Sequence, residues 1–160
     1  MSSAAGGQPV IEVSAVVIRR ADGAVLTVRK RGTDAFMLPG GKPEPGETPA
    51  QTAARELAEE LRIEIDPDDL RPLGAFDAAA ANEAGTLVRA EVFEAPPLHV
   101  RGPAAEIEEL RWLPVRGHRP AARPAAGAPV LIDRVLPLLE GYRAAPPAPS
   151  AHDRSIDPVE

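Results

Sequence analysis

The sequence contains no cysteine, which excludes disulfide bonds and cysteine-ligated zinc. Aromatic residues are also scarce, at 3%, but hydrophobic residues make up 44% of the 160 residues, with alanine supplying many of them, and this suffices for the core of one domain. No apolar run reaches the roughly 18–20 residues of a membrane span. The first eight residues lack the charged and apolar regions of a signal peptide. We therefore expect a cytoplasmic protein without a membrane partner.

Positively charged residues are fewer than negatively charged ones. The sequence has 18 Lys and Arg residues against 24 Asp and Glu residues, which gives a net charge of −6. A nucleic-acid polymer is therefore not the expected partner, since binding to its backbone needs a basic surface. A small phosphorylated ligand is compatible with this charge if a metal ion masks the repulsion between carboxylates and phosphate. The histidines at 99, 118 and 152 lie apart, without a second ligand at helical spacing, and we assign them no chemistry.

The stretch 40–63 combines a glycine-rich loop with a short amphipathic helix. Thr48 is suited to the N-cap, Pro49 to the first helical position, and Gln51 completes a capping box. With 3.6 residues per turn, five apolar side chains share one side of this helix and should face a core. These are Ala50, Ala53, Ala54, Leu57 and Leu61.

Three carboxylates, Glu56, Glu59 and Glu60, converge on a neighbouring side of the same helix. The arrangement works against the helix, because Glu56 and Glu60 repel at i, i+4 by roughly 0.2–0.5 kcal/mol. Negative charge near a helix C-terminus also opposes the macrodipole. Such a local conflict indicates a functional site, and three hard oxygen donors suit Mg²⁺ or Mn²⁺. The alternative is a solvated acidic face.

The spacing of this stretch resembles the Nudix box, G-x5-E-x7-R-E-U-x-E-E-x-G-U, in which U is a bulky aliphatic residue. The matching residues are Gly41, Glu47, Arg55, Glu56, Leu57, Glu59, Glu60 and Ile63. One position departs from the pattern, because Arg62 replaces the second glycine. We expect Arg62 either to adopt a positive φ, at a cost of about 1 kcal/mol, or to end the helix differently.

The resemblance implies a site for Mg²⁺ or Mn²⁺ formed by Glu56, Glu59 and Glu60, with the backbone carbonyl of Gly40 as a further ligand. It also implies that Glu47 and Arg55 keep loop and helix in register and orient these carboxylates, with Gly41 in support. We therefore count Arg55 with the catalytic residues.

The general base stays open among Glu56, Glu60 and Glu106. Many family members place an additional glutamate beyond the box, and here Glu106 is the first choice and Glu109 the second. The alternative for Glu106 is a merely solvated acid.

Strands are expected where β-branched residues recur, and helices where apolar residues follow a 3.6-residue period. Val10–Arg19 and Ala24–Lys30 should form a hairpin around a turn at 21–23, and Ala104–Leu110 should be a turn or short helix. Further strands are predicted at Leu70–Asp77, Thr86–Ala95 and Arg111–Val115, and a second helix at Pro129–Glu140. This pattern predicts an α+β or α/β fold with mixed strand directions.

The resemblance narrows the fold to the Nudix type, an α/β/α sandwich with a mixed sheet. We expect a flexible N-terminus at 1–9, one domain at 10–143 and a Pro/Ala-rich disordered tail at 144–160. Trp112 is interpreted as a core residue and Phe36 as core or lip packing rather than a stacking platform for a base.

Two interpretations of the basic run Arg29–Arg31 stay open. It is either an exposed strand end or a place where one side chain touches a substrate phosphate.

The resemblance implies a Mg²⁺-dependent hydrolase that cleaves the diphosphate linkage of a nucleoside diphosphate derivative, such as a nucleoside triphosphate or a nucleotide sugar. The alternatives are a catalytically silent, nucleotide-sensing module of the same fold and an acidic interaction protein. The partner would be a small nucleotide-type substrate, and a homodimer is an option because dimers are common in the family.

Overall fold

The computed structural model describes residues 7–79, 85–115 and 135–139. Its strands are β1 (Val10–Val17), β2 (Val25–Lys30), β3 (Phe36–Met37), β4 (Gly40–Gly41), β5 (Arg71–Ala79), β6 (Leu87–Glu94) and β7 (Ile107–Leu113). The helix α1 (Pro49–Leu61) follows β4, and a 3-10 turn, η1 (Pro67–Asp69), precedes β5. Residues 135–139 are also helical. Among the described residues, no helix is long and apolar enough to cross a membrane.

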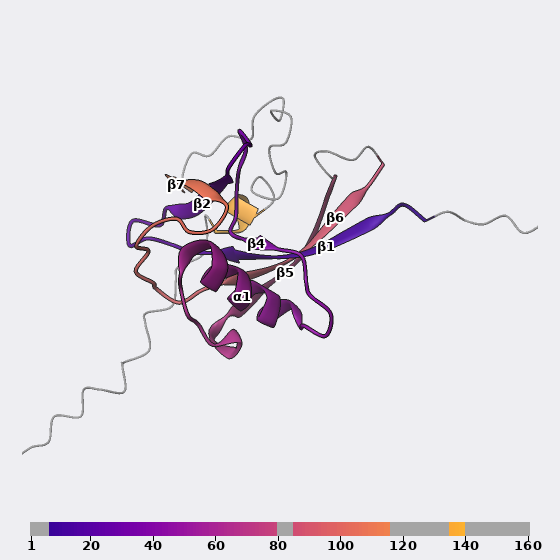
Figure 1. Cartoon of the computed structure of the whole chain (residues 1–160), viewed down its shortest axis with the longest axis horizontal. Helices are drawn as coiled ribbons and strands as arrows, with labels where there is room; N and C mark the ends of the chain where they lie inside the picture. Colours follow the sequence, from indigo (N-terminus) through magenta and orange to yellow (C-terminus); the bar gives the residue numbers. More distant parts are fainter. Residues whose placement is uncertain (1–6, 80–84, 116–134, 140–160) are drawn as a thin grey trace, which may run out of the picture.

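The strands form two sheets (Figure 1). The larger sheet has the order β4-β1-β6-β5, and in it β1 pairs with β6 in parallel, from Val10 opposite Leu87 to Val17 opposite Glu94. The other pairs in this sheet are antiparallel, so the sheet is mixed, as expected. The smaller sheet has the order β3-β2-β7 and is antiparallel.

The expected hairpin between the first two strands is confirmed only beside its turn, where the Arg20 N–H donates to the Ala24 carbonyl and the Leu26 N–H donates to the Ile18 carbonyl. The turn itself is present, because the Gly23 N–H donates to the Arg20 carbonyl at 2.8 Å. Beyond one bridge between Arg19 and Val25, however, β1 and β2 enter different sheets. The reason is that β1 is buried on both faces at its C-terminal half. An interior strand of this kind gains more from full-length pairing with β6 than from a local hairpin.

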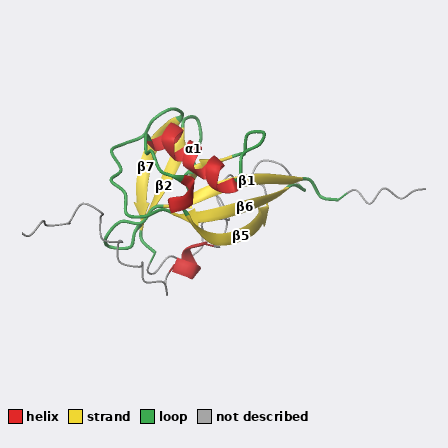
Figure 2. Ribbon diagram, turned by 90° about the horizontal axis from the view of Figure 1, so that it is seen from below, coloured by secondary structure: helices red, strands yellow, loops and turns green. Residues whose placement is uncertain are grey.

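Alternate residues of β1 face two separate cores, as the two-residue period of a strand requires. Val16 packs in a cluster with α1, whereas Val17 packs in a second cluster that includes Leu136. Figure 2 shows α1 on one side of the larger sheet and the helical residues 135–139 on the other. The predicted α/β/α arrangement is therefore confirmed.

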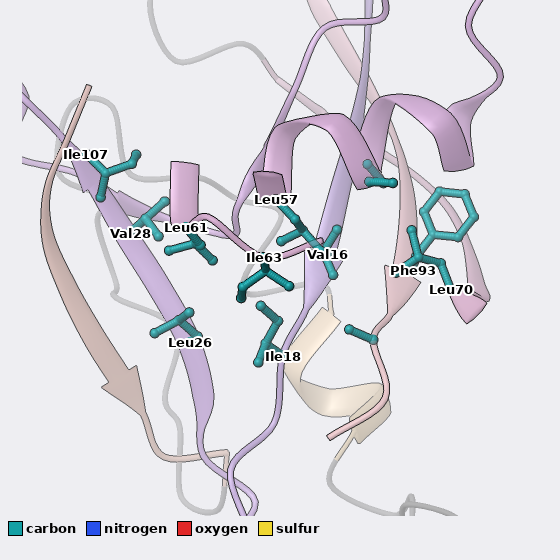
Figure 3. Close-up of a cluster of buried hydrophobic side chains, with 13 residues drawn as sticks. Val16, Ile18, Leu26, Val28, Leu57, Leu61, Ile63, Leu70, Phe93 and Ile107 are labelled. Carbon is teal, nitrogen blue, oxygen red and sulfur yellow. The ribbon is translucent and has the colours of Figure 1, made fainter. Parts of the chain in front are cut away.

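Helix α1 also joins the two sheets. Leu57 and Leu61 point from α1 into the space between β1 and β2 (Figure 3). The predicted apolar side of the helix is confirmed, since Ala53, Ala54, Leu57 and Leu61 are buried and Ala50 is partly buried. Their neighbours on the two strands are Val16, Ile18, Leu26 and Val28. Because each buried leucine contributes roughly 1.5–3 kcal/mol, this helix cannot shift without disturbing both sheets.

The segment expected as a turn or short helix at Ala104–Leu110 needs correction. Only its beginning is a turn, and β7 starts at Ile107 and pairs with β2. Its helix-forming glutamates are overridden by cross-strand pairing, which is the stronger determinant in a sheet.

Trp112 of β7 is partly buried against the core that contains α1, with the Arg20 guanidinium 5.1 Å above its ring, so its interpretation as a core residue holds.

Two expected segments fall partly or wholly outside the described residues. Of the predicted helix Pro129–Glu140, only 135–139 is described, and that part is helical. Leu138 is 56% exposed there. The tail 144–160 lies outside the described residues.

Arg62 ends α1 in the left-handed conformation, with φ 55° and ψ 36°. Its N–H donates to the Ala58 carbonyl at 3.1 Å, and the Ile63 N–H donates to the Leu57 carbonyl at 3.2 Å. Ile63 then turns inward and is buried. Of the two alternatives at this position, the chain adopts the positive φ, which is costly for a residue with a Cβ atom.

Replacing Arg62 with glycine should therefore stabilise the protein. We expect Arg62→Gly to raise the free energy of unfolding by about 1 kcal/mol, because glycine adopts this conformation without strain. Urea denaturation measures the change. Arg62→Ala is the control, since it removes the exposed side chain but keeps the strain. A gain as large in Arg62→Ala as in Arg62→Gly would contradict the explanation.

Candidate active site

The start of α1 is fixed by local hydrogen bonds that the sequence predicts. Thr48 Oγ1 accepts from the Gln51 N–H at 3.2 Å, and the Thr48 N–H donates to Gln51 Oε1 at 2.9 Å. This is the expected capping box, with Pro49 at the first helical position. The helix consequently begins at a defined residue, which sets the direction of every side chain that follows.

Arg55 connects the preceding loop to the middle of this helix. Its Nε and Nη2 atoms donate to the two oxygens of Glu47 at 2.8 and 3.0 Å, and Nη2 also donates to the Lys42 carbonyl at 3.0 Å. The guanidinium lowers the pKa of Glu47 to about 2, helped by the Glu44 N–H. Two parallel hydrogen bonds fix orientation as well as distance. Loop and helix are thus held in register.

Two glycines allow the loop to approach the helix and β1 closely. Gly40 has φ +153°, and a Cβ atom on it would lie 2.0 Å from the Ser14 carbonyl oxygen. A Cβ atom on Gly41 would lie 2.3 Å from Glu56 Oε1. Neither position accommodates a side chain without a shift. Gly41 therefore leaves the space that the Glu56 carboxylate occupies.

Glu60 is almost completely buried, with 1% of its surface exposed. Its Oε2 atom accepts from the Gly40 N–H at 3.3 Å, whereas Oε1 has no hydrogen-bond partner among the described residues. Burial raises the pKa of Glu60 to about 8, and the nearby charge of Glu56 adds to the effect. A buried carboxylate oxygen without a partner is costly. A hard divalent cation would satisfy it, so this side chain fits the predicted metal site.

Glu56 and Glu59 both accept from Arg55 Nη1, at 3.1 and 3.3 Å. The Glu56 side chain is 12% exposed, and its burial raises its pKa although Arg55 opposes the rise. Glu59 is 53% exposed. The three predicted carboxylates therefore gather around one end of α1, with a guanidinium between two of them.

Within the described ranges, no group of three or more His, Cys, Asp or Glu side chains is arranged to hold an ion. Arg55 contacts both Glu56 and Glu59, and Glu60 is buried. The donor chemistry nevertheless suits Mg²⁺ or Mn²⁺, since the available oxygens are carboxylate oxygens. Their role as ligands stays a prediction, as does that of the Gly40 carbonyl.

Glu106 lies beside this end of the helix, as predicted for the additional acid. The Ala104 N–H donates to the Glu60 carbonyl, and the Arg31 N–H donates to the Glu106 carbonyl, both at 2.8 Å. The Glu106 carboxylate contacts Lys30 Nζ at 3.2 Å. Glu109, the second choice, instead contacts Arg29 at 3.2 Å on the adjacent strand. The structure therefore brings Glu106, and not Glu109, to the carboxylates of α1.

The sequence analysis missed two features of this region. The sequence did not indicate which residue of the run Arg29–Arg31 would contact Glu106, because the choice of Lys30 depends on the register shift between Arg29 and Lys30 in the sheet. Ala105 has a positive φ of 53°, which no sequence pattern indicates.

Phe36 is partly buried, with the Arg111 guanidinium 4.0 Å above its ring, in agreement with a packing role.

Comparison with known proteins now places the chain in a family. A sequence model described as the NUDIX domain matches residues 9–133. The chain belongs to this Nudix family. The resemblance predicted from the box is thereby confirmed, and with it the enzyme class at the level of the family.

Individual relatives support this membership. The CTP pyrophosphohydrolase of Escherichia coli (strain K12) is 32% identical over 145 residues, covering 86% of this chain and 97% of that protein. The RNA pyrophosphohydrolase of Halorhodospira halophila is 40% identical over 60 residues, or 38% of this chain. That match covers only 32% of the RNA pyrophosphohydrolase. A second match, to a MutT-like protein from Streptomyces ambofaciens, covers 38% of that protein.

A solved structure supports the fold. The MutT protein of Methanosarcina mazei Go1 superposes with a TM-score of 0.66 at 21% identity, covering 84% of this chain and 95% of that one. At this level of identity the similarity concerns the fold alone.

The burial of Glu60 generates a prediction about stability in a chelator. Because the folded state raises the pKa of Glu60 to about 8, it binds a proton that the unfolded chain has already lost above pH 4.5. Stability should therefore fall as pH rises from about 4.5 to 8, by on the order of a few kcal/mol. Glu60→Gln should lose this dependence and exceed the parent in stability at pH 8. Thermal unfolding in EDTA measures both.

Glu59→Gln provides the matched control, because its side chain is 53% exposed on the same helix. We expect its stability to follow that of the parent at every pH. Adding Mn²⁺ should stabilise the parent and not Glu60→Gln. A parent whose stability does not change between pH 5 and 8 would show that Glu60 is not buried as described.

Proposed function

We propose that this protein is a divalent-metal-dependent pyrophosphohydrolase that cleaves the diphosphate linkage of a nucleoside diphosphate derivative, such as a nucleoside triphosphate or a nucleotide sugar. The observation that carries the proposal is the buried Glu60 carboxylate, whose Oε1 atom lacks a partner among the described residues beside Glu56. If the helix had only a structural role, an apolar residue in place of such a group would make the protein more stable. Its presence inside a Nudix domain supports a metal-binding role.

Glu56, Glu59 and Glu60, with the Gly40 carbonyl, would hold Mg²⁺ or Mn²⁺. The chemistry supplied by such an ion when bound is the neutralisation of phosphate charge and a lower pKa of bound water. The remaining contribution is positioning, which dominates catalysis of phosphoryl transfer. Arg55 provides part of this positioning. Its bidentate contact with Glu47 fixes the direction from which the guanidinium contacts Glu56.

The choice of general base follows from exposure. Glu56 and Glu60 are largely or fully buried, and a carboxylate that binds a cation is no longer free to accept a proton. The Glu106 side chain is 62% exposed and lies beside the same carboxylates. Among the three candidates it is therefore the one that can accept a proton from the attacking water and release it to solvent.

Substrate identity is tested with a panel. We expect cleavage of at least one compound among normal and oxidised nucleoside triphosphates, nucleotide sugars, ADP-ribose and dinucleoside polyphosphates, in the presence of Mg²⁺ or Mn²⁺. CTP belongs in the panel because one relative, matched over 97% of its own length, is named a CTP pyrophosphohydrolase. Product masses show which bond breaks. Binding of a nucleotide without cleavage of any compound would instead support the nucleotide-sensing alternative.

A variant series tests the assigned site. Glu56→Gln should lower kcat by at least about 100-fold while the protein stays folded, because it removes a negative charge from the metal site. Glu108→Gln is the control, since Glu108 is an exposed acid that contacts Arg31. Kinetics on the best substrate, with unfolding curves for each variant, give the comparison. If Glu56→Gln kept the turnover of the parent, Glu56 would not hold the metal.

A further inference from the structure

The three basic residues at the end of β2 diverge in direction. Arg29 contacts Glu109 and Arg31 contacts Glu108, whereas Lys30 contacts Glu106. The pairing of β2 with β7 shifts register between Arg29 and Lys30. Such a bulge redirects a side chain relative to its neighbours. Of the whole run, Lys30 alone joins an acid that lies beside the carboxylates of α1.

Lys30 lies close to those carboxylates as well. Its positive charge lowers the pKa of both Glu56 and Glu60, against the larger effect of burial. Its side chain is 32% exposed, so it is neither enclosed in the core nor free in solvent. The ammonium group therefore contacts Glu106 and is near enough to Glu56 and Glu60 for its charge to act on both.

The backbone that carries Glu106 is fixed on both sides. Ala104 donates to the end of α1, and the Glu106 carbonyl accepts from the Arg31 N–H. Between these anchors, Ala105 holds a left-handed conformation that is strained for a residue with a Cβ atom. With the backbone held in place, only the Glu106 side chain is left to change its partner.

The two cations of the site differ in how firmly they are held. Arg55 is bound by both oxygens of Glu47 and by the Lys42 carbonyl. The Lys30–Glu106 pair is one ammonium–carboxylate contact, in which the two side chains are 32% and 62% exposed. Exposed ion pairs of this kind contribute little to stability. A lysine ammonium is a compact charge that changes partners without a fixed geometry. Lys30 is therefore the cation able to leave its acid for an incoming anion.

We propose that Lys30 is a substrate-positioning residue that exchanges Glu106 for a phosphate group of the substrate, and that this exchange releases Glu106 towards the attacking water. The proposal rests on the hydrolase function proposed above. Glu106 then accepts the proton of a water molecule whose oxygen forms the new bond to phosphorus, while the bridging oxygen leaves with the departing phosphate. Before substrate binds, the base is held by Lys30, which couples its release to occupancy of the site.

Binding of methylenediphosphonate, which carries two phosphorus groups and cannot be hydrolysed, tests the exchange by calorimetry in the presence of Mn²⁺. We expect Lys30→Gln to raise its Kd at least 10-fold and Lys30→Arg to restore part of the affinity. Arg31→Gln is the matched control, because it removes the same charge from an exposed ion pair at the residue directly after β2. Its Kd should equal that of the parent. Equal Kd values for Lys30→Gln and the parent would overturn the proposal.

Two further readouts separate positioning from a structural role. Mn²⁺ alone should bind several-fold more tightly to Lys30→Gln, because a positive charge beside the carboxylates is gone, whereas a damaged site would bind it more weakly. Glu106→Gln should bind methylenediphosphonate as tightly as the parent or more tightly, since Lys30 is released, while its kcat falls at least 100-fold. Weaker binding by Glu106→Gln would also overturn the proposal.

Failure of the proposal is distinguishable from failure of the proposed function. If the parent cleaves no compound of the panel, the hydrolase assignment fails, and the diphosphonate and Mn²⁺ affinities still decide whether Lys30 binds phosphate. If the parent is active and Lys30→Gln has an unchanged KM, the hydrolase stands and the exchange is wrong. Should Lys30→Gln not fold, Glu106→Gln decides the exchange by itself, because it leaves Lys30 in place.

Discussion

The burial of one carboxylate, that of Glu60, constrains the whole site. It projects from the helix that joins both sheets, and it is 1% exposed although its Oε1 atom has no hydrogen-bond partner among the described residues. The fold offsets the cost of burial with the Gly40 N–H and the charge of Lys30. A cation would offset it further. If a cation binds there as proposed, stability and metal affinity are linked through a single side chain, because whatever relieves the buried charge also stabilises the fold.

The loop before α1 makes this burial possible. Glycines at 40 and 41 allow the chain to pass within contact of β1 and of the Glu56 carboxylate. Arg55 then closes the loop onto the helix through Glu47. Apart from Gly40, which precedes it, these are residues of the Nudix box, and their contacts explain why the spacing between them matters. A residue inserted between Glu47 and Arg55 would rotate the guanidinium away from its partner by about 100° of helix.

Family membership and substrate choice rest on different parts of the molecule. The match of the NUDIX domain model to residues 9–133 establishes the family. Lys30 and Glu106 form their ion pair outside the box. The relatives differ in the substrates for which they are named. Substrate specificity is therefore a question for binding experiments on this chain.

Much of the site was predictable because it is encoded over a few neighbouring residues. The capping box at Thr48 and the apolar side that contains Leu57 follow from helix geometry, and the left-handed option at Arg62 follows from its place in the Nudix box. The pairing of β1 with β6 was not predictable, since a strand buried on both faces carries no local mark of its partner. The helix-forming glutamates before β7 were misleading for the same reason, because cross-strand contacts overrode them.

The sequence by itself determined the family, the helix and the set of carboxylates, because these depend on spacings within one segment. Only the tertiary structure decided that Glu60 is buried, that Glu106 rather than Glu109 approaches it, and that Lys30 contacts Glu106. The physical reason is that burial and charge contacts depend on the packing of segments far apart in the chain. A helical period fixes which side of a helix a residue occupies, but not what covers that side.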